Sequence, residues 1–121
     1  MSFVNAEHKE RYEELLRRGR IDRDVERCVV MYIVSGNDDL YSKVNELYDF
    51  KKNQILFDLK ESENGEEEIL WKAYLSSSQE KLMLLALSLY SGRNHVGVVE
   101  LFRTLDSNNK KLALNAISMR F

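Results

Sequence analysis

The sequence contains no proline and only five glycines in 121 residues. Proline breaks helices because it lacks a backbone N–H group and its ring clashes with the preceding turn, and glycine weakens them. A chain with so few breakers therefore favours helices over a turn-rich β fold. The length corresponds to one domain. We predict an all-α fold over residues 1–121, a single compact helical domain of about five or six helices.

Apolar residues recur along much of the chain at the spacing of an amphipathic helix. Apolar side chains almost surround the segment from Leu82 to Leu89, which predicts that its helix lies at the centre of the bundle. The run from Val29 to Val34 is rich in β-branched residues and could be a buried strand, but the length of its segment favours a helix. The predicted helices cover residues 6–18, 23–35, 39–48, 78–91, 95–105 and 108–119.

Polar residues that can cap helices precede most of these segments. A cap side chain accepts a hydrogen bond from a backbone N–H group of the first turn, which would otherwise have no partner. Ser77 and Glu80 have the spacing of a capping box. The other predicted caps are Asn5, Asp22 or Asp24, the run Asn37–Asp39, Asn94, and Asp106 or Ser107, and the predicted helix ends are Gly19, Gly36 and Gly92.

Residues 49–75 follow no single pattern, and the sequence leaves them open between helix, strand and loop. Alternate residues from 55 to 59 are apolar, which indicates a short extended stretch. Residues 61–68 contain five glutamates and the dipeptide Asn64-Gly65. We predict that this acidic segment is an exposed loop or the start of a helix.

Charge is distributed unevenly along the chain, whose formal net charge is −2. Residues 1–92 carry a net −5 and residues 93–121 a net +3. A protein that binds duplex DNA usually has a basic excess over the whole domain, since phosphate contacts supply much of the affinity. That excess is missing, although the last two predicted helices could form a helix-turn-helix surface. The alternative hypothesis of nucleic-acid binding depends on Arg93, Arg103, Lys110, Lys111 and Arg120.

Few residues could support catalysis or bind a metal ion. Cys28 is the only thiol and His8 and His95 are the only imidazoles, whereas a cysteine enzyme needs a base and an orienting third group around its thiol. Because Cys28 adjoins an apolar run, we interpret it as a core residue. The sequence lacks the ligand spacing of zinc sites and calcium loops and the glycine loop that binds phosphate. We therefore predict a protein that is not an enzyme and uses no cofactor or metal.

Two acidic segments are candidates for a protein-binding surface. The first segment, residues 37–41, could instead cap a helix. The second segment, residues 66–68, could instead form a solvated acidic face. Aromatic side chains beside charged residues are typical of protein interfaces and less typical of membrane or duplex surfaces. The predicted partner-binding residues are Asn37, Asp38, Asp39 and Tyr41 in the first segment and Glu66, Glu67 and Glu68 in the second.

The sequence has no feature that directs it to a membrane. Its first residues lack the apolar core of a signal peptide. No apolar run approaches the length of a membrane span, which is about 20 residues. We therefore expect a cytoplasmic protein with a reduced Cys28.

Several segments together match the pattern of a known family. They are Glu7–Tyr12, Val25–Arg27, Tyr32–Tyr41, Leu82–Gly92, and the closing pairs and runs Leu101-Phe102, Leu105-Asp106, Asn115–Ile117 and Arg120-Phe121. In these segments the chain resembles an uncharacterised family of small proteins from phages and prophages of Gram-positive bacteria. The similarity covers most of the chain except the acidic stretch near residues 60–70.

The resemblance implies a phage or prophage origin and a bacterial cytoplasm, and it carries no catalytic residues. We expect an accessory protein that acts by protein–protein contact on a host or phage protein, such as a host defence or regulatory protein. The identity of the partner and the oligomeric state stay open, and a homo-oligomer is one of the alternatives.

Overall fold

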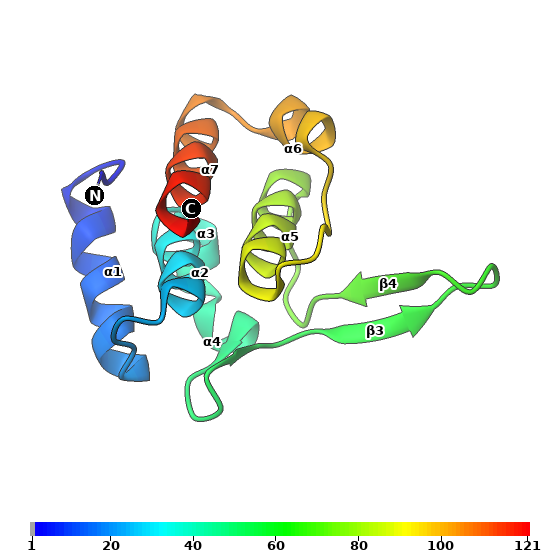
Figure 1. The fold of residues 1–121 in the computed structure, drawn as a ribbon, viewed down its shortest axis with the longest axis horizontal. Helices are drawn as coiled ribbons and strands as arrows, with labels where there is room; N and C mark the ends of the chain where they lie inside the picture. The colour runs from blue at the N-terminus through cyan, green and yellow to red at the C-terminus, as the bar shows by residue number, and fades with distance from the viewer. Residues whose placement is uncertain (1) are drawn as a thin grey trace.

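The computed structural model describes residues 2–121. In this part of the chain the structure has seven helices and two antiparallel sheets of two strands each (Figure 1). The elements are α1 (Ala6–Gly19), α2 (Val25–Ser35), α3 (Asp38–Ser42), α4 (Val44–Leu47), β1 (Tyr48–Asp49), β2 (Gln54–Ile55), β3 (Asp58–Glu61), β4 (Glu67–Leu70), α5 (Ser77–Ser91), α6 (Val98–Thr104) and α7 (Ser107–Arg120). The predicted all-α fold is therefore wrong, because part of the segment between α4 and α5 forms strands. Over residues 2–121, no helix combines the length and apolar character needed to cross a membrane.

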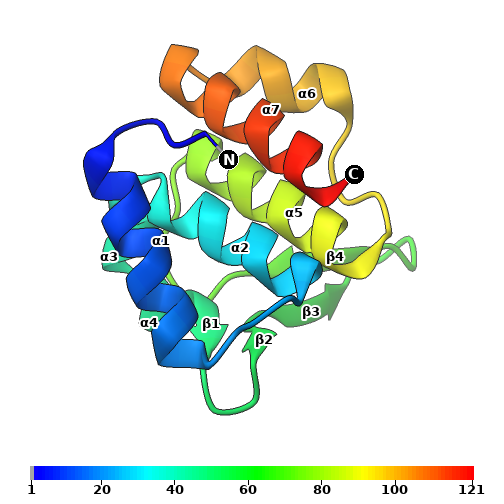
Figure 2. The same ribbon diagram turned by 60° about the vertical axis from the view of Figure 1, so that its left-hand side comes forward.

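Helix α2 lies at the centre of the helical body. It packs against α1 on one side and against α5 and α7 on the other (Figures 1 and 2). Seven successive residues, Val29 to Ser35, are buried, so the prediction of a helix here is confirmed. Helix α5, which was expected to be the single central helix, forms the opposite side of the same core through residues such as Leu82, Met83 and Ala86. The core therefore has two inner helices, since α2 buries almost its whole circumference.

Side-chain caps begin most helices where the sequence predicts them. A cap accepts a hydrogen bond from the backbone N–H group three residues on, and the confirmed caps are Asn5, Asp24, Asn37 and Asp106. Gly36 and Gly92 follow α2 and α5 as predicted, and Gly92 has the left-handed backbone of a helix end, with φ at 76°. Cap residues and glycines in the sequence therefore predict most of the helix starts and several of the helix ends.

Three predicted boundaries are wrong. The capping box of α5 lies one residue earlier than predicted, at Ser76 and Gln79. Helix α6 begins at Val98 without a side-chain cap, so the preceding segment from Asn94 is not helical. Helix α1 includes its glycine, and the left-handed position belongs to Arg20.

The helix predicted at 39–48 is interrupted and shorter than expected. The chain leaves the helical path at Lys43, whose Nζ donates to a backbone carbonyl oxygen just before α5 at 2.6 Å. Tyr48 is buried and already extended, and it pairs with Ile55 between β1 and β2. Asp49 closes the turn, because its Oδ1 accepts hydrogen bonds from the backbone N–H groups two and three residues on. This local turn competes with continued helix.

Strands β3 and β4 form a hairpin that projects from the helical body (Figure 1). The register pairs Leu59 with Ile69 and Glu61 with Glu67. Gly65 closes the turn at a φ of 80°, which glycine adopts without strain. The acidic segment, predicted as an exposed loop or the start of a helix, is an exposed turn at residues 62–66 with strand ends on either side, and the helix alternative is wrong.

Candidate functional site

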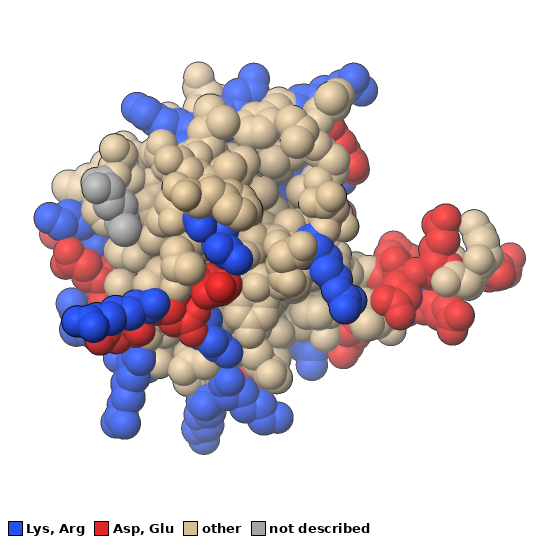
Figure 3. Space-filling view, viewed as in Figure 1, with Lys and Arg blue, Asp and Glu red and all other residues tan. Residues whose placement is uncertain are grey.

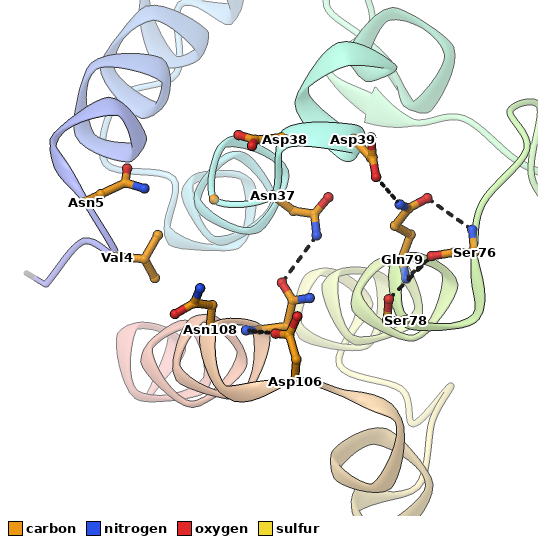
Figure 4. A pocket seen from close by; sticks show the side chains of 12 residues that line it. Val4, Asn5, Asn37, Asp38, Asp39, Ser76, Ser78, Gln79, Asp106 and Asn108 are labelled. Atoms are coloured by element: carbon orange, nitrogen blue, oxygen red, sulfur yellow. Dashed lines mark hydrogen bonds between the residues drawn. The ribbon is translucent and has the colours of Figure 1, made fainter.

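The N-terminal ends of α1, α3, α5 and α7 meet at one polar pocket, which we call the N-cap pocket (Figure 4). It is lined by the residues that cap these helices, Asn5, Asn37, Ser76 and Asp106. Its volume is about 570 Å³. The other residues that line it are Val4, Gly36, Asp38, Asp39, Ser78, Gln79, Asn108 and Asn109.

Hydrogen bonds between side chains fix the walls of the N-cap pocket (Figure 4). Asn37 Nδ2, before α3, donates to Asn109 Oδ1 on α7 at 3.2 Å. Gln79 Nε2 on α5 donates to Asp39 Oδ2 on α3 at 2.6 Å. Gln79 Oε1 also accepts from the Ser76 N–H group at 3.0 Å. These bonds join three helices and hold the polar groups of the pocket in fixed orientations.

The lining of the N-cap pocket contains three carboxylates and, among the residues that the structure describes, no lysine or arginine. The Arg11 guanidinium, outside the pocket, donates to Asp38 Oδ1 at 2.6 Å, and this bond raises the pKa of Arg11. The same guanidinium lies 4.5 Å from the centre of the Tyr41 ring. Carboxylates at helix N-termini are stabilised by the helix dipole. The structure thus brings together the predicted residues of the first acidic segment, Asn37, Asp38, Asp39 and Tyr41.

The glutamates of the second segment lie elsewhere, in residues 58–70, which we call the acidic hairpin. The acidic hairpin contains six acidic residues and one lysine, a net charge of −5, so the rest of the chain carries a net +3. Figure 3 shows acidic side chains gathered on this projection, apart from the helical body. Glu66, Glu67 and Glu68 are all exposed. Figures 1 and 2 place α3 well away from the hairpin tip, so the seven predicted residues form two surfaces.

A groove lies between the acidic hairpin and the end of α5, and we call it the hairpin groove. Its volume is about 430 Å³. Leu59 and Ile69 are directly opposite each other in the hairpin, so their side chains share the face that lines the groove. Leu70 lies one residue further and therefore on the other face. The lining residues are Phe57, Leu59, Glu67 and Ile69 on the hairpin side, and Leu87, Ser91, Arg93 and His95 on the other side.

The five basic residues of the nucleic-acid hypothesis do not share one site. Arg93 lines the hairpin groove. Arg120 connects helices, since its Nε donates to the Leu89 carbonyl oxygen at 3.0 Å and its guanidinium lies 3.5 Å from Glu26. The remaining three, Arg103, Lys110 and Lys111, are exposed on α6 and at the start of α7. In Figure 3 the basic side chains near α6 and α7 stand apart from one another.

The thiol of Cys28 and the imidazole of His8, which could perform nucleophilic or metal chemistry, are buried or hydrogen-bonded within the fold. Cys28 is partly buried against the core, and this burial raises the pKa of its thiol, which disfavours the reactive thiolate. Both ring nitrogens of His8 are engaged by backbone groups, with Nδ1 accepting from Val4 N–H at 3.1 Å and Nε2 lying 2.8 Å from the Tyr32 carbonyl oxygen. In residues 2–121, no three His, Cys, Asp or Glu side chains are grouped so that they could hold a metal ion.

Sequence reasoning missed residues that the structure places in both cavities. Gln79 and Asn109 join the N-cap pocket from helices far along the chain. Gln79 had a local signal, since Ser76 precedes it at the spacing of a capping box. The hairpin groove had no comparable signal, because Leu59 and Leu87 come together only in the folded chain.

These features define a small protein of helices with a polar pocket at four helix starts and one projecting acidic hairpin. The chain belongs to a family of unknown function, DUF6075, whose model matches residues 1–121. The predicted membership of an uncharacterised family is confirmed at this level. No curated protein and no solved structure matches the chain.

Proposed function

We propose that this protein acts by binding another protein, without catalysis, and that the acidic hairpin is its main contact with a basic surface on that partner. The observation that carries this proposal is the position of the charge. A net −5 is concentrated on residues 58–70, while the rest of the chain carries a net +3. Seven of the eight strand residues of the hairpin are exposed.

A projecting acidic element favours association with a basic partner for two physical reasons. Concentrated charge of one sign steers an oppositely charged surface toward it and raises the association rate. An exposed hairpin also reaches beyond the body, so it can enter a concave surface. Strands β3 and β4 contribute little buried apolar area to the core, so most of the surface of this segment is free to meet a partner.

The predicted surface Asn37, Asp38, Asp39 and Tyr41 forms a second, smaller contact in this proposal. Asp38 offers its carboxylate outward, since its side chain is 88% exposed despite the bond to Arg11. Asp39 and Asn37 are bonded into the wall of the N-cap pocket. They would therefore shape the contact, while Asp38 would meet a cationic side chain of the partner.

The setting that we propose comes from the resemblance of the sequence to small phage and prophage proteins. We propose an accessory protein of a phage or prophage, acting in the cytoplasm of a Gram-positive bacterium. Its partner would be a host defence or regulatory protein, or another phage protein. The resemblance lies in segments of α1, α2, α3, α5 and the C-terminal helices rather than in the acidic hairpin.

Capture of partners from a Gram-positive lysate tests the proposal. The hairpin variant, Glu66→Gln/Glu67→Gln/Glu68→Gln, removes three charges from the acidic hairpin. The body variant, Glu10→Gln/Glu13→Gln/Glu46→Gln, removes three charges from exposed glutamates of α1 and α4 and is the matched control. We expect a partner that the wild type and the body variant capture and the hairpin variant does not. Equal capture by all three proteins, or capture of nothing, would contradict the proposal.

A further inference from the structure

We propose that the hairpin groove receives an apolar side chain of the partner, from a segment in which that side chain is flanked by basic residues. This inference rests on the proposed function and states the chemistry of the partner segment that the acidic hairpin binds. The hairpin groove contains no helix cap and lies outside the core, so this inference gives it a role.

The groove has an apolar floor on an otherwise acidic element. Leu59 is 57% exposed, although it is paired with Ile69 and faces the groove. Leu87 of α5 forms the base and is only 4% exposed. The volume of about 430 Å³ falls within the range of ligand pockets, about 300–1,000 Å³. Leu59 and Ile69 extend this apolar floor from α5 onto the hairpin.

The charges around the groove select the occupant. Glu67 lines the hairpin side, and Glu61 is directly opposite Glu67 and on the same face. Arg93 and His95 line the other side. A segment with lysine or arginine next to its apolar side chain would pair with the two glutamates while the apolar group contacts Leu59. An acidic segment would meet the net −5 of the acidic hairpin, and like charges repel. A neutral apolar segment would leave Glu61 and Glu67 beside a buried contact without partners, which is costly.

A second copy of this chain fits the groove less well. In a symmetric pair of copies that meet at their grooves, two hairpins with net charges of −5 would lie side by side, and like charges repel. We therefore assign the groove to a basic, amphipathic segment of a different protein.

Two peptides serve as defined probes. The first is an acetylated heptapeptide of alternating lysine and leucine, and the second has serine in place of each leucine. Both carry the same charge, so they differ only in the apolar side chains. The single tryptophan, Trp71, is a built-in fluorescence reporter, because its ring centre lies 6.1 Å from that of Phe57, which lines the groove. We expect the leucine peptide to bind about tenfold more tightly, as the burial of one leucine side chain predicts.

A pair of leucine variants locates the contact. Leu59→Ser removes the exposed leucine of the groove, and Leu70→Ser removes an exposed leucine from the opposite face of the same hairpin. Both side chains are too exposed for their loss to unfold the protein, which circular dichroism would check. We expect Leu59→Ser to weaken the leucine peptide about tenfold and Leu70→Ser to change it less than about twofold.

The outcomes separate this inference from the proposed function. Equal binding of the two peptides, equal effects of Leu59→Ser and Leu70→Ser, or no binding of either peptide would overturn the groove assignment. A dimer of the wild type that Leu59→Ser dissociates would also overturn it, because a second copy would then fill the groove. The proposed function fails separately if the hairpin variant captures the same partners as the body variant.

Discussion

His8 shows how its surroundings decide the role of a single residue. It is 1% exposed and packs against the rings of Phe3 and Tyr32, with centre distances of 5.1 and 4.5 Å. Because Val4 N–H donates to Nδ1, the ring proton is on Nε2, which donates to the Tyr32 carbonyl oxygen. Protonation would place a second proton on Nδ1 and break the bond to Val4. Burial accordingly lowers the pKa of His8 below 6.5, although the bond to Tyr32 opposes this shift.

The lowered pKa of His8 predicts that the protein loses stability in mild acid. Below pH 6.5, the pKa of an unperturbed histidine, the unfolded chain binds a proton that the folded chain does not. The free energy of unfolding therefore decreases as the pH decreases. The fall ends where His8 titrates in the folded state. Urea denaturation at pH 7.5 and 5.5 measures the difference, and His8→Asn should reduce it. A difference of the same size in His8→Asn would assign it to other groups.

Gly36 is a position where a side chain has no room. A Cβ there would lie 2.3 Å from Leu112 Cδ1 and 3.0 Å from the His8 ring, whereas a Cβ at Gly97 would meet no atom within 4 Å. We predict that Gly36→Ala costs about 1–3 kcal/mol through overpacking. Gly97→Ala should change the stability by less than about 0.5 kcal/mol. Equal unfolding free energies of the two variants in urea would contradict the close contact of Gly36, after α2, with Leu112 on α7.

At the scale of elements, local signals predict helix starts well and strands poorly. A cap acts within three residues, so Asn5 and Asp106 could be recognised from the sequence alone. The strands are only two to four residues long. The alternation of apolar residues from 55 to 59 indicates extended chain where β2 and β3 lie, but no pattern predicts β1 or β4. Asn37, Asp38 and Asp39 could be grouped from the sequence because they are adjacent, whereas their bonds to α5 and α7 depend on the folded chain.

The start of α5 offers two overlapping capping boxes, and the fold selects one. Ser76 with Gln79 and Ser77 with Glu80 both have the required spacing. The first is formed because Gln79 also reaches Asp39 Oδ2. We predict that Gln79→Ala destabilises the protein by about 1–2 kcal/mol and Glu80→Ala by about 0.5 kcal/mol or less. Thermal unfolding of both variants would check the order, and a larger loss in Glu80→Ala would contradict it.

At the scale of the whole molecule, the fold shows where the charged segments of the sequence lie. Division of the chain at residue 92 indicates an acidic body with a basic end. The acidic excess lies in residues 58–70, and the structure shows that this segment projects from a body with a net +3 (Figure 1). Protein binding through one element is therefore better supported than a uniformly acidic surface would suggest.

The nucleic-acid hypothesis predicts that the basic residues outside the acidic hairpin form a surface that binds DNA or RNA. Arg93 and Arg120 have contacts away from α6 and the start of α7, so Lys110 and Lys111 lack a continuous basic surface around them. Phosphate contacts must be numerous to give appreciable affinity. We predict no mobility shift of duplex DNA or RNA at low salt. A shift that Lys110→Ala/Lys111→Ala abolishes would contradict this prediction and support the alternative.

The central claim is that the acidic hairpin binds a basic partner. Its most direct test is the dissociation constant of the captured partner over a range of salt concentrations, for the wild type, the hairpin variant and the body variant. Because removal of contacting charges weakens binding and its salt dependence, we predict that the hairpin variant binds at least about tenfold more weakly and responds less to salt. The body variant should stay within about twofold of the wild type. Equal dissociation constants of the two variants at every salt concentration would contradict the account.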